Sequence, residues 1–582
     1  MLHIYLLALV QIFGCKEFNQ PDVVIHERPK PVIVKNYFRS PVDHTFKIAG
    51  TFCELRPNHF HTGIDIKSSN GVQGDNIYAI ADGYISRIGI SPTGYGYALY
   101  ITHKNGFTSV YGHLKSYSPE ILKFALAEQE RQERFDIQYY PDSTLIPVKK
   151  GQIIGYMGNS GSSNGAHLHF EIRETDSETP INPLLFGFNS QDSMKPGISY
   201  ARIYDLDDEF NEYNAKNLMV KKRGNLFVPT LGDTITTLSP TIGLGINTRD
   251  GQEGNWNKNG VYSIKLLVND SLTYYIKMDS ISFEKTRMIN AHIDYPEQRL
   301  KRNYVHKCYS LPGNTLPIIQ YQQLRGLISL NELERKKITF IVSDYNNNIS
   351  EMTFFVKRNI GNPNFIKPLY NYIVPYNKAT FIQDSGIYIL FTDKTFFKNQ
   401  FLTFSKKVNL NKSIYSAVYD IANPDIPVYN YYNCKILANG IPQHLKNKSF
   451  IAGIEGVNQI TNWGGTWEGE WLNAPVRTCG TFFIAVDTIP PSIVPLIFSK
   501  NLTRTSRIVF KIDDNILPAG QTPYLNYKAY INDKYIPMEY DLKTKTIDYV
   551  FPKGFQKGTY TFRLEVFDAL NNTKVYSATF IK

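Results

Sequence analysis

Short apolar blocks separated by turns run through most of the chain and predict β structure. Residues 260–268 and 338–342 are rich in Ile, Val, Leu, Phe and Tyr, and they are followed by turn residues such as Asn and Asp, a composition typical of strands. Two segments differ. Residues 2–13 form one apolar run, and residues 118–136 begin with Ser118-Pro119-Glu120, which suits a helix start. We therefore predict a mostly β protein with one inserted helix.

The length and the spacing of these blocks predict several domains. A chain of 582 residues is long enough for three to five domains with separate cores. Two stretches, 338–348 and 561–572, run from a strand through an Asp to an Asn pair, as in the last hairpins of immunoglobulin-like sandwiches. We predict a signal peptide at 1–20, a histidine-rich domain at 38–190, a β-sandwich at 197–359, a β-rich domain at 363–486 and an immunoglobulin-like domain at 488–582.

Histidines concentrate in the amino-terminal part, where nine of the twelve lie before residue 170. Residues at i, i+2 and i+4 of a strand share a face, so His61 and Asp65 are predicted to project together, with Gly63 leaving room between them. His167 and His169 share a face in the same way. Three nitrogen or oxygen ligands with one open position are typical of a catalytic zinc. Strand parity alone does not choose between His167 and His169 as a ligand.

Each of these motifs has an ordinary structural explanation when it stands alone. A single His-x-His on a strand is usually a polar or partly buried pair, and His113 by itself is an ordinary strand histidine. The co-occurrence of the three motifs in one segment favours the metal site. We interpret His59 as a polar neighbour, with a supporting or alternative-ligand role as the other option. His103 is predicted to be a strand-end residue.

Residues 50–188 resemble the lysostaphin-type (LytM-type) zinc endopeptidases, which cut peptide bridges in bacterial cell walls. The resemblance rests on five strings, namely His61-Thr62-Gly63-Ile64-Asp65-Ile66, Ala79-Ile80-Ala81-Asp82-Gly83, Tyr111-Gly112-His113-Leu114, Lys150-Gly151-Gln152-Ile153-Ile154-Gly155 and His167-Leu168-His169-Phe170-Glu171-Ile172. It implies an antiparallel-sheet catalytic domain with a groove. The patterns in the rest of the chain predict two or three immunoglobulin-like β-sandwich domains after it.

The resemblance also implies the roles of the site residues. His61, Asp65 and His169 would bind one Zn²⁺, and His113 and His167 would act on the water and the substrate, in an order that the sequence leaves open. The implied activity is hydrolysis of peptide cross-links of peptidoglycan. Two other classes stay open. One is a catalytically silent LytM-type module that binds and activates another wall hydrolase, although such modules usually lack a site residue. The other is an adhesion or scaffold protein.

An extra stretch from Ser116 to Leu145 separates the strand of His113 from the Gly151 turn. Ser118 is predicted to cap its helix, with Pro119 at the first helical position. The helix near 118–136 could narrow the cleft, contact the substrate or dock another protein. Packing on the flank of the domain is the alternative.

The amino terminus predicts export to the cell envelope. Leu2 to Phe13 has the length of a signal peptide and is too short for a permanent membrane anchor. It ends in Ile12-Phe13-Gly14-Cys15, which resembles a lipobox. We therefore expect a periplasmic or outer-membrane lipoprotein, possible surface exposure, and membrane attachment through a lipidated Cys15. The alternative is a simple secretion signal with an incidental cysteine.

Charge, cysteines and tryptophans add little to this picture. The net charge of +11 favours acidic envelope polymers, but Lys and Arg are scattered, so we expect no nucleic-acid partner. Cys434 and Cys479 could pair in an oxidising envelope, whereas Cys53 is interpreted as a core residue. The Trp-rich loop 462–471 is predicted to fill the core of a β-domain, with a glycan-contact loop as the alternative.

Overall fold

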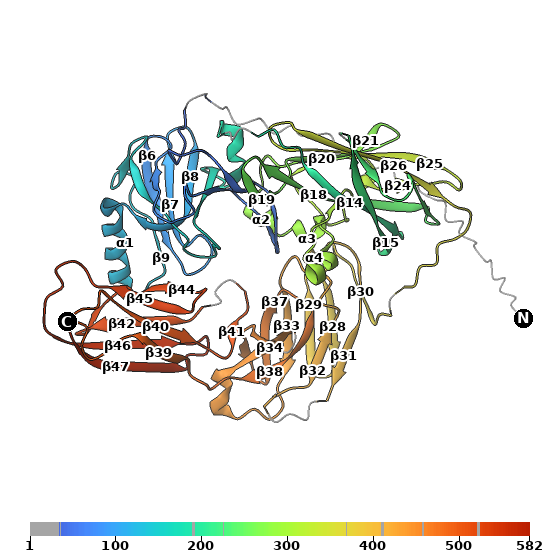
Figure 1. Ribbon diagram of the computed structural model, residues 1–582. Helices are drawn as coiled ribbons and strands as arrows, with labels where there is room; N and C mark the ends of the chain where they lie inside the picture. Colours follow the sequence, from blue (N-terminus) through green and yellow to red (C-terminus); the bar gives the residue numbers. More distant parts are fainter. Residues whose placement is uncertain are drawn as a thin grey trace, which may run out of the picture.

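The computed structural model describes residue 34 and residues 37–188, 192–224, 226–367, 369–408, 413–456, 459–520 and 524–582. It is mostly β, as predicted, and its strands form four units in chain order. Figure 1 shows these units arranged as a ring in which the fourth unit returns to the first. The predicted signal peptide and Cys15 lie outside the described residues. No helix within the described ranges is long and apolar enough to cross a bilayer.

The first unit is an antiparallel sheet whose main path runs β1-β4-β12-β8-β7-β6-β10, with β5, β9, β11 and β13 paired beside it. Its elements are β1 (Ile48–Gly50), β2 (Leu55–Arg56), β3 (His59–Phe60), β4 (Ile64–Lys67), β5 (Asn76–Tyr78), β6 (Gly83–Ile90), β7 (Tyr97–His103), β8 (Phe107–Tyr117), α1 (Pro119–Gln132), β9 (Ile137–Tyr139), β10 (Pro147–Val148), β11 (Ile153–Met157), β12 (His167–Glu174), β13 (Pro180–Ile181) and the 3-10 turn η1 (Pro183–Phe186).

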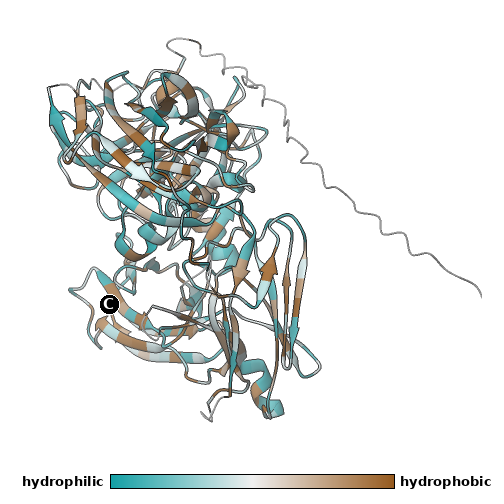
Figure 2. Ribbon diagram, turned by 90° about the vertical axis from the view of Figure 1, so that its right-hand side faces the viewer, coloured by the Kyte–Doolittle hydropathy of each residue, from teal (hydrophilic) through white to brown (hydrophobic). Residues whose placement is uncertain are grey.

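Strand β12 lies in the middle of this sheet and separates the core from the polar site. Its residues Leu168, Phe170 and Ile172 are fully buried in the hydrophobic core. The residues that alternate with them are His167, His169, Glu171 and Arg173. The two-residue period of a strand places these on the opposite face. Apolar and polar residues alternate along the strands in this way in Figure 2. The sequence period thus sorts β12 into a packing face and a chemical face.

The inserted helix α1 packs on the flank of the first unit and contacts the fourth unit. Ile121 and Ala125 are buried on its inner side, and Pro119 occupies the first turn as predicted. Ser118 holds the N-cap position as predicted, although its side chain makes no capping hydrogen bond. Just beyond the helix, the Glu133 carboxylate accepts hydrogen bonds from Lys528 Nζ at 3.0 Å and from the Tyr530 hydroxyl at 3.2 Å. The insertion therefore docks another part of the same chain.

The second unit is one 13-stranded sheet with a short helical insertion. Its elements are β14 (Gly197–Leu206), β15 (Glu212–Arg223), β16 (Leu226–Pro229), β17 (Thr234–Thr237), β18 (Thr241–Gln252), β19 (Asn255–Asn259), β20 (Ser263–Val268), β21 (Ser271–Lys277), α2 (Phe283–Thr286), α3 (Ile289–His292), α4 (Tyr295–Lys301), β22 (His306–Lys307), β23 (Ile319–Gln322), η2 (Leu324–Gly326), β24 (Ile328–Ser329), β25 (Arg335–Ser343) and β26 (Ile349–Arg358). It contacts the first unit where Asn257 Nδ2 donates to the carbonyl of Ala49 at 2.9 Å.

The third unit contains a five-stranded sheet, a two-stranded sheet and most of a six-stranded sheet. Its elements are β27 (Tyr372–Val374), β28 (Thr380–Asp384), β29 (Ile387–Phe391), β30 (Gln400–Leu402), β31 (Phe404–Lys407), β32 (Val418–Ile421), β33 (Tyr432–Leu437), η3 (Gln443–Lys448), β34 (Ser449–Glu455), β35 (Gln459–Asn462), β36 (Thr466–Glu468), β37 (Trp471–Val476) and β38 (Gly480–Val486). Trp463 and Trp467 pack against its core, as predicted. Cys434 and Cys479 are buried free thiols, so the suggested disulfide is not formed, and Cys53 of the first unit is a core residue as expected.

The fourth unit has two four-stranded sheets that share one core. Its elements are β39 (Ser492–Ile497), β40 (Arg507–Asp513), β41 (Leu517–Pro518), β42 (Asn526–Ile531), β43 (Lys534–Tyr535), β44 (Glu539–Asp541), β45 (Thr546–Val550), β46 (Thr559–Phe567) and β47 (Thr573–Ile581). Strand β41 crosses to the third unit and pairs in parallel with β35. The predicted last hairpins are present, because β25 pairs with β26 and β46 pairs with β47.

Candidate metal and catalytic site

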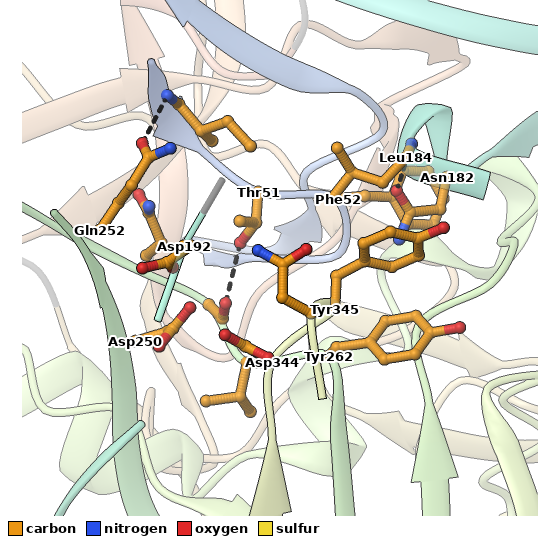
Figure 3. Close-up of a pocket in the computed structure, with 15 residues that line it drawn as sticks. Thr51, Phe52, Asn182, Leu184, Asp192, Asp250, Gln252, Tyr262, Asp344 and Tyr345 are labelled. Atoms are coloured by element: carbon orange, nitrogen blue, oxygen red, sulfur yellow. Dashed lines mark hydrogen bonds between the residues drawn. The ribbon is translucent and has the colours of Figure 1, made fainter. Parts of the chain in front are cut away.

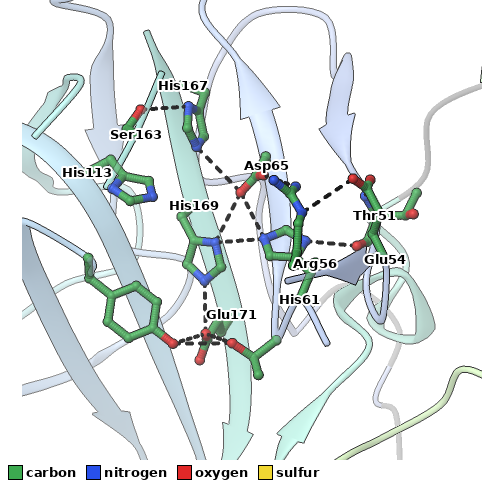
Figure 4. Close-up of polar contacts among 12 residues, drawn as sticks. Thr51, Glu54, Arg56, His61, Asp65, His113, Ser163, His167, His169 and Glu171 are labelled. Atoms are coloured by element: carbon green, nitrogen blue, oxygen red, sulfur yellow. Dashed lines mark hydrogen bonds and ion pairs between the residues drawn. The ribbon is translucent and has the colours of Figure 1, made fainter. Parts of the chain in front are cut away.

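The five predicted site residues meet on the polar face of β12 and its two neighbours (Figure 4). His169 of β12 lies opposite Asp65 of β4 on one side and opposite Gly112 of β8 on the other. This register brings together segments that are about a hundred residues apart in the sequence. His113 follows Gly112 in β8, and His167 begins β12. All five residues are therefore gathered by three adjacent strands and the loops at their ends.

Three side-chain atoms converge at the centre of the site. His61 Nε2 and His169 Nδ1 each lie 3.0 Å from Asp65 Oδ1, and the two nitrogen atoms lie 3.0 Å from each other. All three residues are buried. The donor set of two imidazole nitrogens and one carboxylate oxygen is one that binds zinc in proteins.

The outer nitrogen of each of these two histidines has a fixed hydrogen-bond acceptor. His61 Nδ1 donates to the carbonyl of Thr51 at 2.8 Å, and His169 Nε2 donates to Glu171 Oε1 at 2.8 Å. In neutral imidazoles the inner nitrogens therefore carry lone pairs. They face Asp65 Oδ1, which is also an acceptor. Three acceptor atoms without a proton between them fit a bound cation, and the outer contacts are of the kind that orient metal-binding histidines.

The charged groups of the protein also favour a positive charge at the centre of the site. Burial would lower the pKa of His169, but hydrogen bonds to Asp65 and Glu171 outweigh it and raise that pKa to about 9. Burial would raise the pKa of Asp65, but the surrounding histidines hold it well below the usual value. The two carboxylates therefore favour a positive charge at the centre of the site.

His113 and His167 flank this centre, and His167 Nε2 lies 3.5 Å from Asp65 Oδ1. The His113 ring lies 4.8 Å from the His167 ring and 5.8 Å from the His169 ring, between centroids. His113 Nδ1 donates to the carbonyl of Ser160 at 2.8 Å, and His167 Nδ1 lies 2.9 Å from the carbonyl of Gly165. Burial, together with the nearby His169 and His167, lowers the pKa of His113 to about 3. Its imidazole is therefore neutral at physiological pH.

The structure corrects one prediction about the backbone and adds one feature that was not predicted. His61 does not share a strand with Asp65, because β3 ends at Phe60 and β4 starts at Ile64. The two side chains meet through the intervening turn instead of through strand parity. His113 lies within β8 as predicted, but its φ is +60°, which a non-glycine residue adopts mainly at turns or functional sites.

The other two histidines behave as interpreted from the sequence. His59 is exposed, and its Nδ1 contacts the carbonyl of Pro57 at 3.0 Å. His103 is the last residue of β7 and is held by the carbonyl of Asp82 and the hydroxyl of Ser109. Neither is among the atoms that converge on Asp65.

A buried carboxylate behind the site was missed in the sequence. Glu171 is fully buried and contacts His169, the hydroxyl of Thr62 at 2.6 Å, the hydroxyl of Tyr95 at 2.7 Å and Arg173 Nε at 2.6 Å. Burial would raise its pKa, but Arg173 and His169 hold it far below the usual value. The signal was present, since Glu171 follows His169 by two residues on the same strand face. A second missed contact joins Arg56 Nη2 to Asp65 Oδ2 at 3.1 Å.

The comparison with protein families identifies the domain formed by the first unit. The model of peptidase family M23 matches residues 59–123 and 146–183, and the unmatched interval begins within α1. The chain contains an M23 peptidase domain. Residues 371–487, in the third unit, match the Zu5-like domain model. The interruption at α1 agrees with the insertion that was predicted between the motifs.

Curated relatives are similar to this chain over part of its length. The DD-carboxypeptidase/endopeptidase Mpg of Neisseria meningitidis is 32% identical over 148 residues, which is 25% of this chain and 25% of that protein. The murein hydrolase activator NlpD of Escherichia coli is 33% identical over 124 residues, 21% of this chain and 25% of that protein. The chain thus spans about a quarter of the length of these relatives.

Solved structures are also similar to part of this chain. The catalytic domain of the prophage-encoded M23 protein EnpA from Enterococcus faecalis is 25% identical with a TM-score of 0.19, covering 25% of this chain and 98% of that one. The catalytic domain of lysostaphin from Staphylococcus simulans is 24% identical with a TM-score of 0.19, covering 24% of this chain and 91% of that one.

Proposed function

We propose that this chain is a zinc-dependent endopeptidase that hydrolyses peptide cross-links of peptidoglycan. The observation that carries the proposal is the convergence of His61, Asp65 and His169 with two further histidines beside them. The name of Mpg, an endopeptidase, supports the same activity. We also propose a location in the cell envelope, periplasmic or on the outer membrane, with attachment through a lipidated Cys15.

In this proposal the three converging residues hold one zinc ion and the two flanking histidines move protons. Zinc, when bound, supplies a Lewis acid for a peptide carbonyl and lowers the pKa of a water molecule. His113 and His167 each turn Nδ1 away from the centre toward a backbone carbonyl. The other nitrogen is left to accept a proton from the attacking water and to return it to the leaving amine. Either histidine can fill either role.

The rival is a silent module that activates another wall hydrolase, as the name of NlpD describes for that protein. The presence of all five site residues favours the enzyme. Metal analysis combined with digestion separates the two. The enzyme is expected to bind one zinc ion per chain and to release cleaved peptides from purified peptidoglycan, with both lost in the His169→Ala variant. Stoichiometric zinc without cleavage, together with stimulation of a second hydrolase, would instead support the activator.

The glycine-rich loop before β12 provides a second test of the geometry. Gly161 has a φ of +67°, and a Cβ there would lie 2.4 Å from the amide nitrogen of Gly96. We expect Gly161→Ala to displace the neighbouring Ser160, whose carbonyl holds His113, and to slow cleavage roughly 10- to 100-fold. The matched control is Gly106→Ala, since Gly106 has a φ of +82° but no atom within 4 Å of the added Cβ. Rates that fall equally in both variants would contradict this role of the loop.

A further inference from the structure

A small cavity lies between the M23 domain and the second unit, separate from the histidine cluster (Figure 3). Its volume is ≈ 40 Å³, enough for an ion and a few water-sized ligands. Thr51 and Phe52 line it from the M23 domain, and Asp250, Tyr262 and Asp344 line it from the second unit. The cavity is thus built by both units at their contact.

Three carboxylates from distant parts of the second unit meet in this cavity. Asp192 precedes β14, Asp250 lies near the end of β18, and Asp344 follows β25 directly. One oxygen from each lies within 4.8 Å of the others. None of the ion pairs found among the described residues includes any of the three. Their negative charges therefore have no cationic partner within the described chain.

A neutral amide adds an independent indication of a ligand. Asn259 lines the same cavity and is 3% exposed, and its Oδ1 has no hydrogen-bond partner among the described residues. Asp250 Oδ1, in a side chain that is 7% exposed, also lacks a partner. Leaving a buried acceptor unsatisfied costs free energy. Two unsatisfied oxygen atoms next to three acidic groups indicate an electropositive occupant.

The energetic cost of the cluster without such an occupant is substantial. Burial first, and then the nearby Asp344 and Asp192, raise the pKa of Asp250 to about 8. Burial also raises the pKa of Asp344. Like charges in a poorly solvated space favour either protonation or a cation.

We propose that the three aspartates and Asn259 bind one calcium ion that fastens the second unit to the M23 domain. All the donor groups are oxygens, which suit hard cations and not zinc. Carboxylates and an amide carbonyl drawn from separate loops form the irregular set of oxygen ligands that Ca²⁺ accepts. Mg²⁺ requires a near-ideal octahedron and retains its water molecules.

The proposed ion lies next to the residue that orients His61. Thr51 donates its hydroxyl hydrogen to the carbonyl of Gly260 at 3.1 Å, and its own carbonyl accepts from His61 Nδ1 at 2.8 Å. Gln252, which also lines the cavity, accepts from the amide of Ile48 in β1 at 2.9 Å. Calcium at this point would thus tie β18 and its neighbours to the segment that supports the zinc ligand.

A similar acidic triad recurs in the fourth unit and provides an internal control. Asp487, Asp514 and Asp568 also offer oxygens within 4.8 Å of one another. In each triad the side chain of one asparagine donates two hydrogen bonds. One goes to the carboxylate of the aspartate that directly follows a strand, and the other goes to the backbone carbonyl of the aspartate that precedes the first strand of the unit. These asparagines are Asn348 and Asn572. The proposal concerns only the first triad.

Terbium luminescence tests the site without any measurement of cleavage. Tb³⁺ replaces Ca²⁺ and emits when nearby tyrosines are excited, and Tyr262 and Tyr345 both line the cavity. The full chain is stripped of metals, given one equivalent of zinc and titrated with Tb³⁺. We expect saturable emission that Ca²⁺ displaces much better than Mg²⁺. Asp250→Asn should weaken this binding at least tenfold, and Asp514→Asn should leave it in place.

Thermal unfolding distinguishes loss of calcium binding from a folding defect in the Asp250→Asn variant. In calcium-free buffer Asp250→Asn should melt no lower than the wild type, because it removes a buried repulsion. With saturating Ca²⁺ the wild type and Asp514→Asn should each gain about 5 °C, while Asp250→Asn gains nothing. Equal calcium responses in the wild type and Asp250→Asn would overturn the proposal. Equal responses to Mg²⁺ and Ca²⁺ would overturn the assignment to calcium.

Discussion

Replacing His113 with alanine is expected to slow the hydrolysis of cross-linked peptides by about 10²- to 10⁴-fold while the zinc content stays unchanged. His113 lies outside the three converging atoms, so its removal should spare metal binding. Its neutral ring, held by the carbonyl of Ser160, is placed to take up a proton near His167. Loss of that proton acceptor should lower kcat more than it raises KM, because the group acts on the reacting atoms and contributes little to substrate affinity.

His59→Ala is the matched control for this prediction. His59 is exposed, neighbours the same motif, and its Nδ1 contacts the carbonyl of Pro57. It should cleave at the wild-type rate with the same zinc content. Single-turnover digestion of defined wall peptides, with zinc measured on the same samples, provides the comparison. Wild-type cleavage by zinc-loaded His113→Ala would remove His113 from the mechanism and weaken the proposed function itself.

The sequence was sufficient to predict the β character, the last hairpins and the residues that gather at the site. The two-residue period of a strand predicts that His167 and His169 lie on one face of β12. In the structure that face is opposite the core. The same rule failed for His61, because a turn and not a strand connects it to Asp65. Periodicity describes regular strands, so it does not predict how a turn directs a side chain. For the same reason, periodicity does not predict the left-handed backbone conformation of His113.

Other features depend on contacts that no local pattern encodes. The backbone carbonyl of Thr51 orients His61, and a carbonyl has no residue-specific signature. The docking of α1 depends on Glu133 meeting Lys528, almost four hundred residues later. The second contact was out of reach because it arises from the ring of units. In that ring Lys543 Nζ of the fourth unit also reaches the carbonyl of Asn159 at 2.6 Å, on the loop that precedes β12.

A second large effect is expected from Arg173, which supports the site from behind. Arg173→Met should destabilise the region around β12 by about 3–5 kcal/mol, because it leaves the Glu171 carboxylate buried without its guanidinium partner. Arg173 Nε lies 2.6 Å from Glu171 Oε2, and both side chains are almost completely inaccessible. The free energy of local opening, measured by hydrogen exchange at the amides of β12, is the suitable quantity, since a chain of four units does not unfold in one step.

Two further variants separate charge burial from loss of packing. Glu171→Gln combined with Arg173→Met removes both charges, so the double variant should lose much less stability than Arg173→Met alone. Arg87→Met should cost under about 1 kcal/mol, because the Glu178 partner of Arg87 is largely exposed, and such pairs contribute little. If the double variant were as unstable as Arg173→Met, packing of the arginine against Tyr100 and Phe283 would explain the loss. Recovery of stability in the double variant would instead mean that the buried Glu171 carboxylate requires the arginine behind it. Glu171 would then be retained for its hydrogen bond to His169.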